Sequence, residues 1–286
     1  MFIPRKILEG KLVQLLNDDI GQGDITTATL IPADLRVEAM VITKEDGVAA
    51  GIMEVTILGE SLGLSAKPLV ADGDEVKKGR VLITFSGDAR TILSFERTAL
   101  NLVSRMSGIA TATRRLSKKL EKAHLNTRIA ATRKTAPGLL YFDKKAVSLG
   151  GGDPHRFHLD DMILIKDNHL TLSKNIETAV KQTKQKASFS KKIEVEVTSV
   201  ADALKAAKAG ADIVMLDNFS PKKIRETIEA LKKLGLSEKI LTEASGGITE
   251  QNLEKYAQTQ VNIISLGELT HSTKALDISM EIKPMK

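Results

Sequence analysis

The sequence contains no cysteine and no tryptophan, and aromatic residues make up only 3% of its 286 positions. Without cysteine the chain can form no disulfide, no thiolate zinc site and no cysteine nucleophile. The scarcity of aromatic side chains argues against binding of single-stranded nucleic acid by base stacking. No hydrophobic run approaches about 18 residues, and the N-terminal segment mixes charges and lacks the apolar core of a signal peptide. These absences predict a cytoplasmic protein with no membrane span.

The charge is modestly positive, with a formal net value of +6. Such a balance suits either nucleic acid or a small polyanionic substrate. Many lysines decorate segments with helical patterning, such as residues 181–192, where they predict solvated helix faces. A nucleic-acid binder would instead need a continuous basic stripe and would show steep salt dependence. A gel shift at low salt distinguishes this alternative, and we expect no nucleic-acid partner.

The first hundred residues predict short strands with one long helix after them. Residues 36–43 alternate in hydrophobicity as a half-buried strand does, and residues 54–62 favour a helix. The segment 71–79 has the composition of a turn between two strands. It is similar to the hairpin of lipoyl or biotinyl carrier domains, but Lys77 and Lys78 lack the flanks of a modifiable lysine, so a structural hairpin is favoured. Residues 89–123 predict a helix that Ser107-Gly108 interrupts or kinks.

The remaining chain alternates short apolar runs with amphipathic helices such as residues 200–209 and 221–234. Buried strands that alternate with helices predict a parallel sheet covered by helices. The repeat length favours a βα-barrel over a Rossmann sheet, and no G-x-G-x-x-G follows the first strand. We therefore expect an α/β fold with an incomplete, TIM-like βα-barrel of about six to seven strands. Its strands are predicted at residues 129–132, 162–165, 193–197, 213–216, 240–242 and 261–266.

Polar residues of one kind or another follow every predicted strand, and βα-barrels place their sites at those ends. The glycine-rich ends of the last two strands predict a phosphate site, with a helix N-terminus behind the glycines. Glu194 and Glu196 share strand parity, so both can point into the barrel mouth. Glu196 and Asp217 end neighbouring strands, which predicts a shared Mg²⁺ that substrate oxygens also bind. The residues expected at the phosphate site are Ser245, Gly246, Gly247, Gly267 and Glu268.

Five cationic side chains gather at the remaining strand ends: Arg133, Lys134, His155, Arg156 and Lys166. A buried cluster of one charge is costly unless a polyanion fills it. The cluster therefore predicts a ligand with several carboxylates or phosphates. Lys166 also suits a Schiff-base aldolase acting on sugar phosphates, an alternative that borohydride trapping would test.

The motifs resemble those of the quinolinate phosphoribosyltransferase family over nearly the whole chain. They are residues 18–27, 95–101, 107–111, 132–138, 150–152 with 155–156, 163–169, 216–218, 245–247 and 269–272. The resemblance implies an N-terminal α/β open sandwich over residues 1–110 and a barrel domain over residues 111–269, with the tail 270–286 returning to the first domain. A related family annotated for molybdenum transport shares some motifs, but the complete cationic set favours the transferase.

The resemblance implies the reaction and its partners. Quinolinate and phosphoribosyl pyrophosphate would react with Mg²⁺ to give nicotinate mononucleotide, pyrophosphate and CO₂ in NAD biosynthesis. A homodimer is implied as the minimum, with a hexamer left open, and Arg97 would reach the neighbouring subunit's site. Lys134, Lys166, Glu196 and Asp217 would be catalytic. Substrate binding would use Arg97, Thr132, Arg133, Lys134, His155, Arg156, Lys166, Glu196, Asp217, Ser245, Gly246, Gly247, Gly267 and Glu268.

The sequence departs from the family pattern at a few places. Leu140 stands where the family often has arginine, Lys145 replaces a usual aromatic or small residue, and Asp153-Pro154 precedes the His-Arg pair in place of the customary residues. The core cations are intact, so these departures affect the expected geometry of substrate binding rather than the reaction.

Overall fold

The computed structural model describes residues 3–173 and 175–285, and the chain divides into two units. Unit 1 comprises Met1–Arg114, Tyr141–Gly151 and Thr273–Lys286, and unit 2 comprises Arg115–Leu140 and Gly152–Ser272. The domain boundary expected after residue 110 falls inside helix α4 (Ala89–Lys122), which continues from unit 1 into unit 2. The segment 141–151, expected in the barrel domain, belongs to unit 1.

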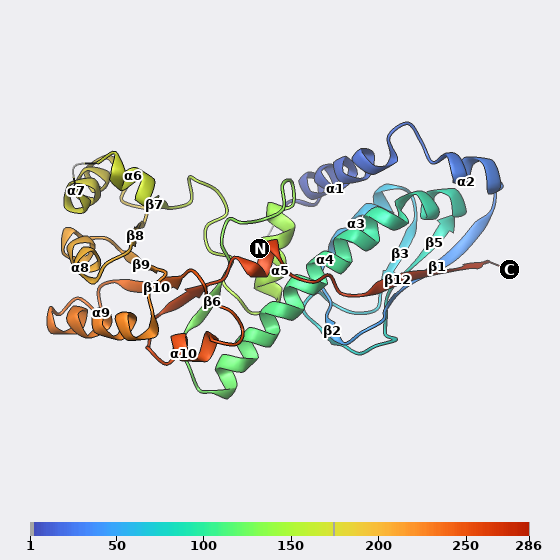
Figure 1. Cartoon of the computed structure of the whole chain (residues 1–286). Coiled ribbons are helices and arrows are strands. Elements are labelled where there is room, and N and C mark those ends of the chain that lie inside the picture. The colour runs from blue at the N-terminus through green and yellow to red at the C-terminus, as the bar shows by residue number, and fades with distance from the viewer. Residues whose placement is uncertain (1–2, 174, 286) are drawn as a thin grey trace. The chain divides into compact units, whose positions relative to one another are not determined.

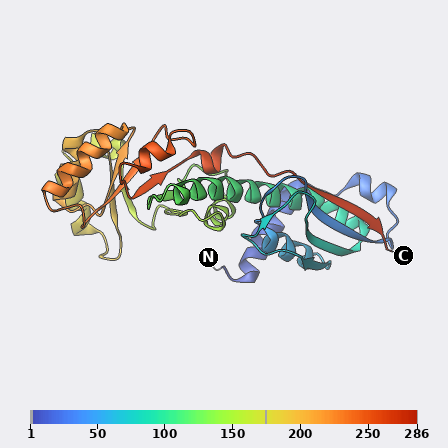
Figure 2. The same cartoon turned by 90° about the horizontal axis from the view of Figure 1, so that it is seen from below.

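Unit 1 is built on an antiparallel four-stranded sheet in the order β12-β1-β5-β3 (Figures 1 and 2). The alternating segment read from the sequence is β1, whose Val37, Ala39 and Val41 are buried. The tail of the chain returns as β12, which pairs with β1 from Val37 to Thr43. The elements are α1 (Arg5–Ile20), α2 (Ile25–Leu30), β1 (Arg36–Thr43), β2 (Gly47–Val48), α3 (Ile52–Ser61), β3 (Ser65–Pro68), β4 (Glu75–Val76), β5 (Val81–Asp88), α4, α5 (Leu140–Leu149) and β12 (Ile278–Pro284).

Two local expectations for unit 1 were wrong. The segment 71–79 is more than a turn, because it contains β4, which pairs with β2. Helix α4 runs without a break through Ser107-Gly108. Ser107 Oγ accepts a hydrogen bond from the Ala50 amide at 3.0 Å, and a side chain on Gly108 would overlap the Lys274 carbonyl. The small residues therefore allow close packing of other segments on the helix, rather than ending it.

Lys145 forms a buried ionic network inside unit 1. Its Nζ lies 2.8 and 2.9 Å from the two carboxylate oxygens of Glu54 and 2.8 Å from Asp72 Oδ2. Glu54 is fully buried, and burial raises the pKa of its carboxyl despite the ammonium group beside it. The lysine that departs from the family pattern thus neutralises two acidic groups of its own unit.

Unit 2 contains a parallel six-stranded sheet in the order β6-β11-β10-β9-β8-β7, as an incomplete βα-barrel requires. Among the residues described, no ladder joins the edge strands β6 and β7. The elements are β6 (Arg128–Ala130), β7 (Ile163–Ile165), α6 (Asp167–Thr171), α7 (Ile176–Lys186), β8 (Ile193–Val197), α8 (Val200–Ala209), β9 (Ile213–Asp217), α9 (Pro221–Lys233), β10 (Leu241–Ser245), α10 (Leu253–Ala257), β11 (Ile263–Ser265) and α11 (Glu268–His271).

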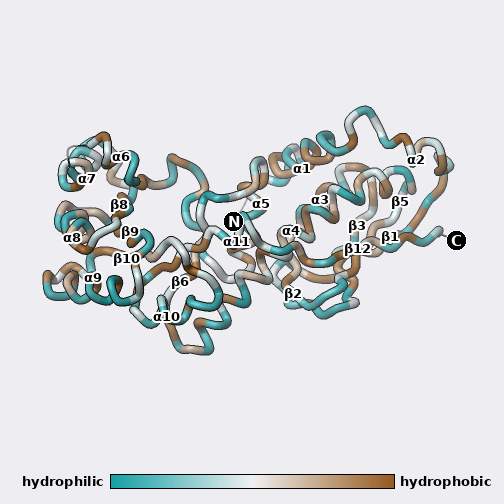
Figure 3. Tube along the Cα trace, viewed as in Figure 1, coloured by the Kyte–Doolittle hydropathy of each residue, from teal (hydrophilic) through white to brown (hydrophobic). Residues whose placement is uncertain are grey.

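The helices of unit 2 follow from local sequence signals. In α9, Ser220 Oγ caps the amide of Lys223 at 3.3 Å, Pro221 occupies the first turn, and Ile224, Ile228 and Leu231 are buried on one face. Hydrophobic and hydrophilic positions accordingly alternate along α9 (Figure 3). In residues 3–173 and 175–285, no helix has the length and apolar character needed to cross a membrane.

Candidate active site

Near the carboxyl ends of the unit 2 strands, polar side chains of neighbouring strands lie in register with one another. Parallel register aligns Glu196 of β8 and Glu243 of β10 with Met215 of β9. Asp217 and Ser245 are paired with each other two residues further along β9 and β10. Because every second residue of a strand points to the same face, these five residues face one side of the sheet.

A cavity of about 420 Å³ lies at this edge of the sheet. Nine expected site residues line it: Thr132, Arg133, Lys134, His155, Arg156, Lys166, Glu196, Asp217 and Ser245. The sequence reading missed Ala131, Leu164, Met215 and Glu243, which also line the cavity. Glu243 was detectable, because it precedes Ser245 by two positions and has the same strand parity. It was overlooked because the strand was expected to end at residue 242, whereas β10 continues to Ser245.

The cationic side chains of the cavity repel one another. Burial lowers the pKa of the Arg156 guanidinium, and the nearby charge of Arg133 lowers it further. Arg156 Nη1 donates only a long hydrogen bond, 3.4 Å, to the Met162 carbonyl. Arg133, Lys134 and Lys166 are exposed. A ligand with several negative charges would relieve this repulsion, so the cavity suits a polyanion.

The backbone and the side-chain stem of Lys134 contact residues that follow the last strand of unit 2. The Thr270 hydroxyl, which is fully buried, donates a hydrogen bond of 2.7 Å to the Lys134 carbonyl. The Lys134 amide donates to Thr132 Oγ1 at 3.2 Å. A Cβ atom on Gly267 would lie 3.1 Å from Lys134 Cδ, so the glycine makes room for the lysine stem. Thr270 lies in the motif 269–272, but the sequence alone did not indicate this contact.

Glu196 and Asp217 form an acidic pair at the mouth of the cavity. Burial raises the pKa of the Glu196 carboxyl; the charge of Lys166 opposes this rise, and that of Asp217 adds to it. Asp217 Oδ2 accepts a hydrogen bond of 2.7 Å from Asn218 Nδ2. Two neighbouring carboxylates at the end of adjacent strands are a fitting donor set for a divalent cation.

The glycine loops have the backbone freedom expected of a phosphate site. Gly246 and Gly247 have φ values of 91° and 63°, and a side chain on Gly246 would overlap Asn218 Oδ1. The expected helix N-terminus is absent directly behind this pair, since α10 begins only at Leu253. Gly267 is the N-cap of α11, a helix of four residues that starts with Glu268. Any phosphate contact there would therefore rely on loop amides more than on a helix dipole.

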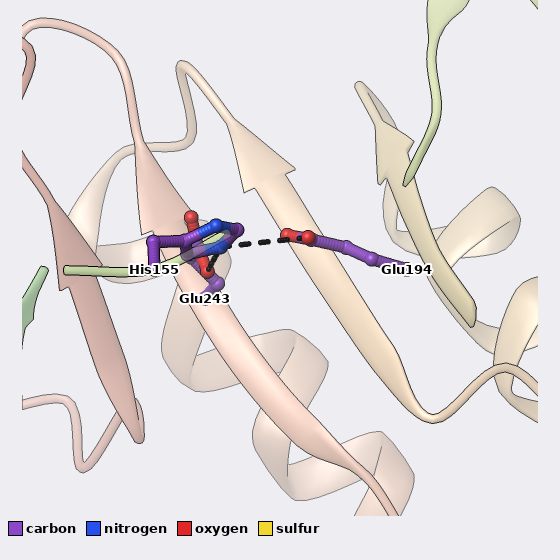
Figure 4. A group of neighbouring side chains, drawn as sticks. All are labelled: His155, Glu194 and Glu243. Atoms are coloured by element: carbon purple, nitrogen blue, oxygen red, sulfur yellow. Dashed lines mark hydrogen bonds and ion pairs between the residues drawn. The ribbon is translucent and has the colours of Figure 1, made fainter. Parts of the chain in front are cut away.

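His155 lies between two buried carboxylates (Figure 4). Its Nε2 is 3.2 Å from Glu243 Oε2 on β10 and 3.5 Å from Glu194 Oε2 on β8. Both glutamates are fully buried, and burial together with Glu243 raises the pKa of Glu194 to about 9. The sequence predicted Glu194 at the barrel mouth, and the structure buries it beside His155.

Arg97 belongs to a different unit of the chain from the residues that line the cavity. It is an exposed residue of α4 within unit 1, whereas all the lining residues of the cavity belong to unit 2. Its expected role in a neighbouring subunit's site therefore stays a prediction.

Comparison with known families supports the resemblance seen in the motifs. The sequence model of "Quinolinate phosphoribosyl transferase, C-terminal domain" matches residues 109–281. That of "Quinolinate phosphoribosyl transferase, N-terminal domain" matches residues 24–107. The two matches together span most of the chain, in the order expected.

Individual relatives agree with the family match. A protein of Methanothermobacter thermautotrophicus, named "Probable nicotinate-nucleotide pyrophosphorylase (carboxylating)", is 47% identical over 273 residues, covering 96% of this chain and 98% of its own. A Nicotiana tabacum protein named "Quinolinate phosphoribosyltransferase (decarboxylating) 2a, mitochondrial" is 37% identical over 300 residues, or 98% of this chain and 83% of its own. The crystal structure of NadC from Streptococcus pyogenes aligns with a TM-score of 0.91 at 32% identity, covering both chains completely.

Proposed function

This chain belongs to the quinolinate phosphoribosyltransferase family, and on that premise we propose that the unit 2 cavity is where it joins quinolinate to phosphoribosyl pyrophosphate. The products are nicotinate mononucleotide, pyrophosphate and CO₂, which makes the protein a nicotinate-nucleotide pyrophosphorylase (carboxylating) of NAD biosynthesis. The observation that carries the placement is the cavity's charge pattern, with mutually repelling cations beside an acidic pair.

Quinolinate has two adjacent carboxylates on a pyridine ring, and the cations supply complementary charge for both. Arg133 and Arg156 offer guanidinium forks that suit carboxylates, and their mutual repulsion falls when a dianion lies between them. Lys134 and Lys166 add point charges at the same rim. Leu164 and Met215 give the cavity an apolar wall for the ring.

The phosphoribosyl group would lie at the loops that follow β10 and β11. The amides of Gly246, Gly247 and Gly267, together with Ser245, can donate to phosphate oxygens. Glu268 follows Gly267 and would face the ribose side. This places the sugar beyond the acidic pair and the pyridine ring over the cations.

Magnesium fits the acidic pair. Glu196 and Asp217 would hold Mg²⁺ together with oxygens of the substrate, since Mg²⁺ keeps few protein ligands and takes substrate phosphates. When bound, the ion would neutralise the leaving pyrophosphate. The two carboxylates also lie where they can stabilise positive charge that develops on the ribosyl carbon.

The reaction needs positioning more than covalent chemistry. The pyridine nitrogen attacks the anomeric carbon of the ribose as the bond to pyrophosphate breaks. The carboxylate on the ring carbon beside the nitrogen then leaves as CO₂, and its electron pair stays on that carbon until a proton replaces it. The pyridinium charge and the ammonium groups of Lys134 and Lys166 stabilise this carbanion, which is the catalytic role we assign to the two lysines.

The active assembly is proposed to be a homodimer in which Arg97 of one protomer completes the other's cavity. Its support is the exposed position of Arg97 on α4, inside one of the family motifs. This additional cation from a neighbouring chain would contact a dianionic substrate only in the assembled enzyme.

The direct test incubates the protein with quinolinate, phosphoribosyl pyrophosphate and Mg²⁺ and follows CO₂ and nicotinate mononucleotide together. We expect the two products in equal amounts. Reaction with nicotinate but not with quinolinate would show that the dicarboxylate pocket is misassigned. No reaction with either would reject the proposed function.

A further inference from the structure

Both ring nitrogens of His155 are already engaged within unit 2. Nδ1 accepts a hydrogen bond of 2.9 Å from the backbone amide of Arg156. A nitrogen that accepts an N–H bond carries a lone pair and no proton. When the ring carries a single proton, this hydrogen bond assigns that proton to Nε2.

The other ring nitrogen lies beside two buried glutamates. Nε2 lies 3.2 Å from Glu243 Oε2, within hydrogen-bond distance, and 3.5 Å from Glu194 Oε2 (Figure 4). Glu194 and Glu243 are fully buried and interact with each other, and outside the group of His155, Glu194 and Glu243 the described residues offer no hydrogen-bond partner to either Glu194 oxygen or to Glu243 Oε1. Only 12% of the His155 side chain is exposed. The imidazole thus supplies one hydrogen bond to a buried acidic pair that has few other partners.

The backbone of His155 has an unusual conformation, and Asp153 holds it in place. His155 has a φ of 54°, a left-handed value that is uncommon outside glycine. Its amide donates to Asp153 Oδ1 at 2.7 Å, and Asp153 is tied to β6 through bonds with Ile129 and Ala131 of 2.8 and 2.9 Å. Backbone strain of this kind is concentrated at functional sites and persists where the surrounding structure holds it in place. The next residue is Arg156, which lines the cavity, so the backbone conformation of His155 affects the direction in which Arg156 leaves the chain.

We propose that His155 is a positioning residue: as a neutral Nε2–H donor to Glu243, and as the acceptor of the Arg156 amide, it fixes the direction of Arg156 and does not itself bind a quinolinate carboxylate. The inference rests on the proposed binding of quinolinate in this cavity. It changes the expected role of His155 from a cationic substrate ligand to a link between the barrel interior and Arg156. It also explains Asp153, which departs from the family pattern yet holds the His155 amide.

A divalent cation bound by His155, Glu194 and Glu243 is the competing interpretation, because their donor atoms all lie within 4.8 Å of one another. Metal coordination at Nε2 would leave the ring with no proton, since Nδ1 accepts from Arg156. A metal-bound histidine normally donates through its other nitrogen. Because the Arg156 amide donates to Nδ1, the geometry favours a ring protonated on Nε2 over a ring that binds a metal through Nε2.

The first test reads the tautomer in the wild-type enzyme by long-range ¹H–¹⁵N correlation of ¹⁵N-labelled histidine, assigned with a His155→Asn variant. We expect the Nε2–H pattern without substrate and the same pattern with quinolinate bound. A doubly protonated ring, an Nδ1–H ring, or a ring that changes state on quinolinate binding would overturn the proposal. So would a stoichiometric divalent metal in protein that has been dialysed against a chelator.

The second test is a double-mutant cycle with His155→Asn and Arg156→Ala, measured as the KM for quinolinate and for phosphoribosyl pyrophosphate. Asparagine tolerates the left-handed backbone and keeps an acceptor near the Arg156 amide, but it cannot reach Glu243 in the same way. We expect His155→Asn to raise the quinolinate KM about tenfold, with little change in the other KM or in kcat. In the Arg156→Ala background the same substitution should have almost no further effect.

Additive effects of the two substitutions would mean that His155 contacts quinolinate directly, which contradicts the proposal. Product formation by the wild-type enzyme is measured beforehand in the same assay. Failure of the positioning role is then distinguishable from failure of the proposed function, because only the latter abolishes wild-type turnover.

Discussion

Replacing Arg156 with alanine should weaken quinolinate binding far more than it affects the rest of the reaction. The guanidinium is half-buried in the cavity wall, and its pKa is lowered first by burial and then by the charge of Arg133. In the free enzyme the charged form of Arg156 is therefore destabilised by burial and by repulsion from Arg133, and a bound dianion would offset both effects. The contribution of Arg156 should appear mainly when quinolinate is present.

The magnitude follows from the position of the side chain. Removing one partner of a desolvated, hydrogen-bonded charge pair costs about 2–5 kcal/mol. Because Arg156 is only half-buried and other cations remain nearby, we expect the lower part of that range, about 2–3 kcal/mol. This corresponds to a loss of roughly 30- to 150-fold in kcat/KM for quinolinate.

The assay is steady-state formation of nicotinate mononucleotide with each substrate varied in turn. Arg225→Ala is the matched control, since Arg225 is an exposed arginine on α9 and its loss changes the net charge equally. Arg156→Lys should lie between wild type and Arg156→Ala, because lysine keeps the charge but loses the fork. Wild-type kinetics toward quinolinate in Arg156→Ala, or an equal loss in the Arg225→Ala control, would refute the reasoning.

Three further outcomes follow. Glu196→Gln should raise the Mg²⁺ concentration needed for half-maximal activity, and an unchanged Mg²⁺ titration would remove Glu196 from the metal site. Lys145→Met should lower the free energy of unfolding in urea by about 3–5 kcal/mol, because it leaves the buried carboxylate of Glu54 without its ion-pair partner. The control Lys11→Met, at an exposed position, should change the free energy of unfolding little. Equal effects of the two substitutions would contradict the buried network. Arg97→Ala and Lys166→Ala homodimers should each be nearly inactive, and mixing them should restore part of the activity; no recovery despite proven subunit exchange would argue against a shared site.

Local patterns were sufficient to predict much of this protein. The alternation in residues 36–43 and the spacing in residues 200–209 gave β1 and α8 with their observed bounds, because strand and helix periodicities are properties of neighbouring residues. The incomplete barrel followed from repeated strand–helix alternation. The position of the cavity at the strand ends followed from the same reasoning, since parallel strands bring their carboxyl ends to one edge.

The partners of buried polar groups could not be predicted in this way. Glu194 and Glu243 come from β8 and β10, which β9 separates, and they lie beside His155 only because the folded sheet and the loop before Arg156 bring the three residues together. Lys145 is likewise paired with groups far from it in sequence.

What the sequence by itself determined is therefore the kind of each element and the chemistry that stands at the end of each strand, because both are encoded by residues close together in the chain. The tertiary structure alone decided which of those groups touch. It gave both ring nitrogens of His155 partners, the Arg156 amide and the Glu243 carboxylate, that the strand-end pattern had not indicated. The physical reason is that a side chain's proton and charge depend on the groups packed around it, and the fold draws those groups from distant parts of the sequence.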